Sequence, residues 1–190
     1  TMLASRPDFF IHCGDIIYAD CPIGAQYKLP NGELWRNVVT AEKSKVAETL
    51  DEFRGNYKYN LLDANLRAFN AEVPIFAQWA DHEVTDDWIP GGAVRADGGY
   101  RENSLLNLVA RGCRAFHEFL PLRQTQAEAG RIYRKISYGP LLDVFMLDMR
   151  SDRGANAHDR ASYGPDAHLL GPTQLAWLKR ELARSRAAWK

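Results

Sequence analysis

Apolar positions along the chain form short continuous runs and longer segments with helical spacing. Residues 9–13, 75–79 and 141–147 are nearly continuous apolar runs, which is typical of buried strands. Residues 132–138 alternate between apolar and polar side chains and lead into a Gly-Pro turn before the third run. We therefore predict that the last two of these segments form a hairpin.

Apolar residues three or four positions apart predict helices at residues 46–57, 62–69, 105–120 and 173–190. We expect the first two helices to cover one face of a sheet. The last helix would carry its apolar side chains on one side, formed by Leu175, Leu178, Leu182 and Trp189. Residues 21–37 and 151–169 are predicted to be irregular loops, the former because of its prolines and glycines. This mixture of elements favours an α/β fold.

Polar side chains follow two of the predicted strands at the point where each strand ends. Asp15 and Tyr18 come after the first strand, and Asp81, His82 and Glu83 come after the second. In open α/β sheets, ligands bind beyond the carboxyl ends of the strands, so we expect the two clusters to meet. This arrangement indicates a metal-assisted hydrolase.

The residue types in the two clusters suit different tasks at a two-metal site. A carboxylate such as Asp15 can bridge two cations roughly 3.5–4 Å apart. Tyrosine has a reference pKa of about 10 and ligates only a strongly acidic cation, so Tyr18 points to ferric iron. Asp81 could hold a second cation, and His82 could bond a phosphoryl oxygen or protonate a leaving group.

Four segments in this order are similar to the blocks of one enzyme family, the PhoD-like alkaline phosphatases within the metallophosphoesterases. They are Gly14-Asp15-x-x-Tyr18, Asp81-His82-Glu83, Asp148-x-Arg150-x-x-Arg153 and Leu170-Gly171-Pro172-x-Gln174-x-x-Trp177. The resemblance covers nearly the whole chain. It implies a four-layer fold in which two β-sheets lie between helices. It also implies a phosphomonoesterase or phosphodiesterase with Fe³⁺ and Ca²⁺, in which a metal-bound hydroxide attacks phosphorus.

The resemblance also implies roles for single residues and a setting for the chain. Asp15, Tyr18 and Asp81 would be metal ligands, and His82 and Arg150 would be catalytic. Residues 1–190 would be part of a catalytic domain, an internal piece that lacks the first and last metal-binding blocks and on its own holds metal weakly. The substrate would be a small phosphate ester or diester, and the enzyme would be periplasmic or secreted.

Several side chains near these motifs have more than one interpretation. Arg150 could clamp phosphate through its planar guanidinium or pair with Asp148. Asp20 could support a ligand, but we favour a solvated loop acid. Glu83 is expected to orient His82 or its loop rather than to bind metal. We expect His12 and Cys13 to be core residues and His117 to be a surface or core residue. His158 and His168 lie on a loop where they could contact substrate, but no motif supports this.

The composition of the chain argues against several classes of function. Lys plus Arg and Asp plus Glu both number 24, so the net charge is zero and no long-range field attracts nucleic acid. No apolar run approaches the roughly 20 residues that span a bilayer. The three cysteines show no Cys-x-x-Cys spacing, so we predict neither a zinc ribbon nor a disulfide framework.

A second interpretation is a non-catalytic domain that keeps the fold and binds a phosphorylated ligand or a protein partner. Ala80 favours it, because relatives usually carry another acidic residue there. Asp86 and Asp87 favour it too, because two extra carboxylates would repel phosphate unless a cation offsets them.

Overall fold

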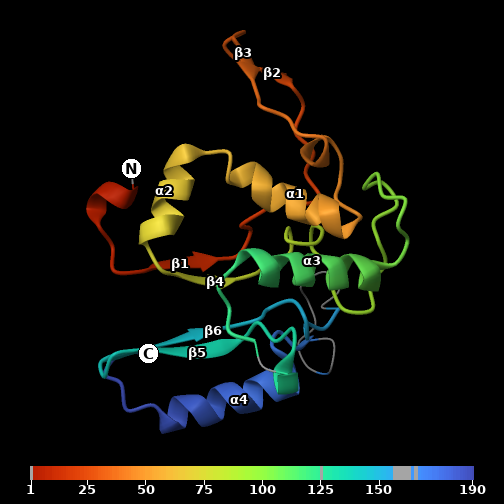
Figure 1. Ribbon diagram of the computed structural model, residues 1–190. Coiled ribbons are helices and arrows are strands. Elements are labelled where there is room, and N and C mark those ends of the chain that lie inside the picture. Colours follow the sequence, from red (N-terminus) through yellow and green to blue (C-terminus); the bar gives the residue numbers. More distant parts are fainter. Residues whose placement is uncertain (1, 125, 156–163, 165–166) are drawn as a thin grey trace.

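A computed structural model describes residues 2–124, 126–155, 164 and 167–190 (Figure 1). Helices and small sheets alternate along the chain, as an α/β fold requires. The elements are η1 (Met2–Ser5), β1 (Phe10–Cys13), β2 (Gln26–Lys28), β3 (Leu34–Arg36), η2 (Glu42–Ser44), α1 (Leu50–Asn60), α2 (Ala64–Glu72), β4 (Ile75–Gln78), α3 (Leu105–Phe119), η3 (Gln126–Glu128), β5 (Arg134–Tyr138), β6 (Leu142–Met146) and α4 (Gly171–Arg184).

Strands β1 and β4 form a parallel pair, and this pairing positions the candidate site. Phe10 lies opposite Ile75 and Cys13 lies opposite Gln78. Because the strands are parallel and in register, they end at the same edge. The segments that follow them, which begin at Gly14 and Trp79, therefore leave the sheet side by side.

The principal core lies between α1, α3 and the segment that follows β4. Phe53 of α1 and Leu108 and Phe116 of α3 are completely buried there, together with Val84. Gly112 lets α3 approach closely, because a Cβ atom at this position would lie 2.8 Å from the carbonyl oxygen of Glu83. In Figure 1, α1 and α2 lie on one side of the β1–β4 pair, as expected for the first two helices.

The predicted C-terminal hairpin is confirmed. Strands β5 and β6 are antiparallel, with Arg134 opposite Met146. Helix α4 covers this hairpin on the side away from β1 and β4 (Figure 1). It packs through Trp177, whose ring lies 4.9 Å from that of Tyr133 and 6.3 Å from that of Phe145.

The predicted extent of the last helix was wrong. It ends at Arg184, and the chain then runs extended so that Trp189 forms a parallel bridge with Leu142. The Ser185 hydroxyl donates to the Asp143 carboxylate at 2.6 Å and fixes this change of direction. The predicted apolar side was also wrong. Leu175, Leu182 and Trp189 are exposed, whereas Gln174 and Trp177 are buried.

Residues 21–37 were predicted to be a loop, but they contain the antiparallel pair β2–β3, with Gln26 opposite Arg36. Figure 1 shows this pair as an arm that stands away from the rest of the chain. Both strands are short and fully exposed, including Tyr27 and Trp35. They therefore lack the alternation of buried and exposed positions that marks a strand in a sequence.

Acid should remove a defined part of the stability at the start of α1. Thr49 and Glu52 form a capping box, and the Glu52 carboxylate also pairs with Lys45 at 2.7 Å. Although burial opposes it, these hydrogen bonds and the Lys45 charge lower the pKa of Glu52 to about 2. A lowered folded-state pKa gives stability that is present above the unfolded value and is lost as the pH falls through the folded value.

We therefore expect Glu52→Gln to cost about 1 kcal/mol at pH 7. The difference from the wild type should shrink as the pH falls from about 4.5 through about 2, below which both proteins carry a neutral side chain. Urea unfolding across this range measures it. A difference that stays constant with pH would contradict the assignment.

Within the described residues, no helix is long and apolar enough to cross a membrane.

Candidate metal centre

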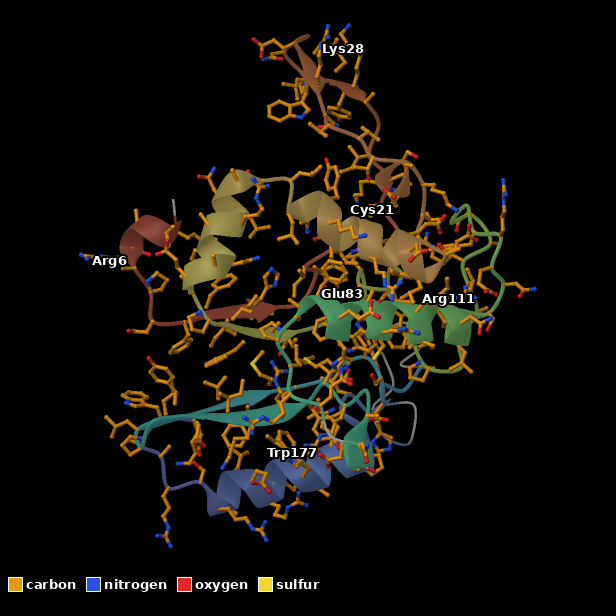
Figure 2. All side chains as sticks on the ribbon, viewed as in Figure 1. Arg6, Cys21, Lys28, Glu83, Arg111 and Trp177 are labelled. Carbon is orange, nitrogen blue, oxygen red and sulfur yellow. The ribbon has the colours of Figure 1, made fainter. Side chains whose placement is uncertain are left out.

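Glu83 joins the two strand ends. Its Oε2 accepts hydrogen bonds from the backbone N–H groups of Asp15 (3.1 Å) and Ala80 (2.7 Å), and its Oε1 accepts from Ile16 N–H (2.5 Å). Burial raises the pKa of Glu83 to about 7, although the three N–H groups favour its ionised form. Figure 2 labels Glu83 beside α3, beyond the ends of β1 and β4.

Gly14 allows the two segments to touch. It has φ 103°, and a Cβ atom there would lie 2.5 Å from the Cβ of Ala80. Only glycine can occupy such a position without moving the neighbouring segment. Asp15 follows at φ 53°, a left-handed conformation that is uncommon outside glycine but tolerated by Asp and Asn.

Asp15 and Tyr18, two of the predicted ligands, follow β1, and Tyr18 is 45% exposed. The Oδ1 atom of Asp15 is buried and has no hydrogen-bond partner among the described residues. The charge of Asp15 is the largest cause that raises the pKa of the Tyr18 phenol, and burial and the charges of Cys21, Glu83 and Asp81 add to it. These charges disfavour the phenolate, so Tyr18 would ligate only a cation strong enough to displace its proton.

His82 is held by a residue whose role the sequence interpretation missed. Its Nδ1 lies 2.9 and 3.0 Å from the two carboxylate oxygens of Asp20, and its ring stacks on Tyr18 at a centroid distance of 4.4 Å. The prediction that Asp20 is a solvated acid was wrong, because only 7% of its side chain is exposed. In the sequence, the only feature that pointed to this role of Asp20 was its position two residues after Tyr18.

Burial acts to lower the pKa of His82, but the hydrogen bond and charge of Asp20 outweigh it, so the pKa is raised above its usual value. The Nε2 atom lies 3.9 Å from the carboxylate of Asp86. Asp20 thus fixes the imidazole through Nδ1, and Nε2 lies on the side of Asp86.

Asp81 and Arg150 form an ion pair at 3.2 Å, and each side chain is 14% exposed. Asp81 also accepts the backbone N–H of Asp87 at 2.9 Å. The Arg150 guanidinium reaches the Asp87 carboxylate at 3.1 Å, while Asp86 pairs with Arg95 at 2.8 Å. Both extra carboxylates are therefore offset by arginines.

Arg150 does not use its side chain to pair with Asp148, one of its two predicted interactions. Asp148 is buried and instead accepts from the Trp79 indole at 2.9 Å and from the backbone N–H groups of Arg150 and Ser151. Its own backbone exchanges two hydrogen bonds with the side-chain amide of Gln174, at 2.8 and 2.6 Å. Asp148 thus positions the turn that carries Arg150.

Lys43 of η2 and Asn60 of α1 hold the loop between Asp15 and Asp20 through hydrogen bonds. The buried Lys43 donates to the Tyr18 carbonyl at 2.5 Å and to the Asn56 side chain at 3.1 Å. Asn60 donates to the Ile16 carbonyl at 2.6 Å. The sequence interpretation found neither contact, because both residues lie in segments without a recognisable motif.

Comparisons with known proteins agree on one family. The sequence profile of the PhoD-like phosphatases matches residues 1–190. The chain belongs to the PhoD-like phosphatase family. It is 30% identical to alkaline phosphatase D of Bacillus subtilis (strain 168) over 198 aligned positions, which cover 99% of this chain and 32% of that protein. A solved structure of PhoD matches with a TM-score of 0.70 and 29% identity, covering 94% of this chain and 34% of the other.

The chain thus spans about a third of the length of these relatives. Membership of the PhoD-like family accounts for the order of the four motifs.

Metal cofactors are consistent with a PhoD-like phosphatase, and the residues at this site fit them. The buried, unpartnered Oδ1 of Asp15 is an oxygen that a hard cation would satisfy. Two further groups have donor atoms within 4.8 Å of one another, namely Asp20, Cys21 and His82, and Asp81, His82 and Asp86. His82 belongs to both groups.

The remaining predicted side chains of this PhoD-like chain lie apart from these groups. His12 is half-buried, and its ring meets that of Phe10 edge-on at 5.6 Å. Cys13 is exposed, so its predicted burial was wrong. Both nitrogens of the half-buried His117 have no hydrogen-bond partner among the described residues. His158 lies outside the described residues.

Proposed function

We propose that residues 1–190 form part of the catalytic domain of a metal-dependent phosphoric ester hydrolase of the alkaline phosphatase D type. The observation that carries this proposal is the buried Oδ1 atom of Asp15, which has no hydrogen-bond partner among the described residues. A small phosphate monoester or diester would be the substrate.

We assign the cations to the residues that fit them. Asp15 would bridge two ions, Tyr18 would bind Fe³⁺ and Asp81 would bind Ca²⁺. When bound, the ions supply an activated water for attack on phosphorus and positive charge beside the phosphoryl oxygens.

His82 would act on the phosphoryl or leaving oxygen through Nε2, because Asp20 occupies Nδ1. Its raised pKa favours the protonated form, which can donate a hydrogen bond or a proton. Arg150 would keep Asp81 and Asp87 in place and offer its guanidinium to phosphate, the role that its planar fork suits.

The wider setting is part of the same proposal. In Figure 1, α1 and α2, the β1–β4 pair, the β5–β6 hairpin and α4 follow one another, and we propose that they belong to a four-layer fold. The relatives are about three times longer, so the rest of the metal ligands would come from outside these residues. We also propose that the enzyme is exported.

A non-catalytic domain is the second candidate function. The ion pair of Arg150 with Asp81, together with the Asp87 N–H group, favours it, because Asp81 is already partnered. Such a domain would bind a phosphorylated ligand or a protein partner without hydrolysing it.

Metal analysis and ester hydrolysis of the protein at its natural length distinguish the two candidates. We expect stoichiometric iron, hydrolysis of p-nitrophenyl phosphate or bis(p-nitrophenyl) phosphate, and loss of hydrolysis after chelation that added metal reverses. The ratio of the two rates separates a monoesterase from a diesterase. A metal-free protein without hydrolysis would favour the non-catalytic domain.

A further inference from the structure

We propose that Glu83 is a positioning residue that fixes Asp15 against the segment after β4. This inference rests on the proposed function for its kinetic consequence, but its structural claim can be tested without hydrolysis. Glu83 is not one of the proposed ligands, and it is completely buried.

The first step of the argument is the set of hydrogen bonds. One carboxylate accepts hydrogen bonds from two segments. The N–H groups of Asp15 and Ile16 lie 68 and 67 residues away along the chain, and that of Ala80 lies three residues away. No other described side chain bonds to these three N–H groups. The carboxylate therefore sets the separation of the two strand ends that carry Asp15 and Asp81.

The second step is the backbone of Asp15. A left-handed conformation is unfavourable for a non-glycine residue, and it persists only where the surroundings impose it. At Asp15, with φ 53°, the imposing contacts are the hydrogen bonds from its own N–H and the next N–H to Glu83. Without them Asp15 can relax to negative φ, which turns its carboxylate away.

The third step is the need for a carboxylate. Both oxygens of Glu83 accept hydrogen bonds, so an amide would place an NH₂ group against at least one N–H donor. The glutamine of Glu83→Gln has nearly the same volume as glutamate. It should lose the backbone N–H hydrogen bonds at one of the two carboxylate oxygens. The backbone of residue 83 cannot shift towards α3 to restore these hydrogen bonds, because Gly112 of α3 lies against the Glu83 carbonyl.

The chain offers a matched control. Glu48 is also a buried glutamate whose carboxylate accepts backbone N–H groups from a distant segment, those of Arg101 and Glu102, the latter at 2.6 Å. Glu48 lies outside the proposed site. Both of these N–H groups donate to Oε1 of Glu48, and its Oε2 pairs with Lys45 at 3.1 Å. Glu48→Gln therefore removes the charge of a buried glutamate without touching Asp15.

The test compares Glu83→Gln and Glu48→Gln in the protein at its natural length. Crystal structures should show Asp15 at negative φ in Glu83→Gln only. Hydrolysis of p-nitrophenyl phosphate should show a kcat lowered about ten- to a hundredfold in Glu83→Gln with KM changed less than about threefold. Both variants should have a lowered melting temperature.

Retention of the left-handed Asp15 in Glu83→Gln overturns the proposal, whether or not the wild type hydrolyses the ester. An equal loss of kcat in Glu48→Gln also overturns it, because the effect would then be one of general stability. A wild type that is inactive while Asp15 still relaxes in Glu83→Gln would refute the proposed function and leave the positioning role intact.

Discussion

Asp15→Asn is expected to lower phosphoester hydrolysis by roughly 10³-fold in the protein at its natural length. Asparagine tolerates the left-handed conformation at φ 53° nearly as well as aspartate, so the backbone should stay in place. What changes is the charge on the buried, unpartnered oxygen that we assign to the cations. The melting temperature should therefore change little while kcat and iron content fall.

Asp8→Asn is the matched control, because Asp8 is an exposed carboxylate without a hydrogen-bond partner among the described residues. It should leave both kcat and metal content unchanged. An Asp15→Asn protein with full activity would refute the assignment of Asp15 and, with it, the proposed metal site.

Asp148→Ala is expected to give the largest loss of stability, about 3–5 kcal/mol. The substitution leaves the buried Trp79 indole N–H and the part-buried backbone N–H groups of Arg150 and Ser151 without their acceptor, Oδ1 of Asp148. Each unsatisfied buried donor costs about 1–3 kcal/mol. Denaturant unfolding measures the difference.

Asp148→Asn separates the hydrogen bonds from the charge. Its amide oxygen can take the place of Oδ1, and its NH₂ can donate to the Ser151 hydroxyl, which now lies 2.5 Å from Oδ2. We expect this variant to lose only about 1 kcal/mol. Equal losses in the alanine and asparagine variants would show that the geometry of these hydrogen bonds does not determine the stability.

The elements that sequence patterns predicted well are those with one buried face. The strands at residues 75–79 and 141–147 and the helix at 105–120 lie within a few residues of their observed bounds, because burial imposes a period on the sequence. The β2–β3 arm and the extended chain at Trp189 have no buried face. Their conformation depends on hydrogen bonds to partners that no local sequence pattern predicts.

The candidate site also contains features that the sequence predicted and features that it did not. Asp15, Tyr18, Asp81 and His82 were found from motifs at strand ends, where a short polar run follows an apolar one. The supporting contacts of Asp20, Lys43 and Asp148 came only from the structure, since each joins a distant segment. Arg150 was found from its motif, but its ion pairs with Asp81 and Asp87 were not.

By itself, the sequence determined the family, the strand-to-loop placement of the acidic motifs and the kinds of ligand they offer, because these depend on residue type and short spacing. Tertiary structure alone decided that one buried glutamate ties both strand ends together, that Asp20 orients His82, and that arginines neutralise Asp86 and Asp87. These contacts join residues more than 60 positions apart in most cases. Only the parallel pairing of β1 with β4 and the packing of α1 and α3 around their ends bring such residues within hydrogen-bonding distance.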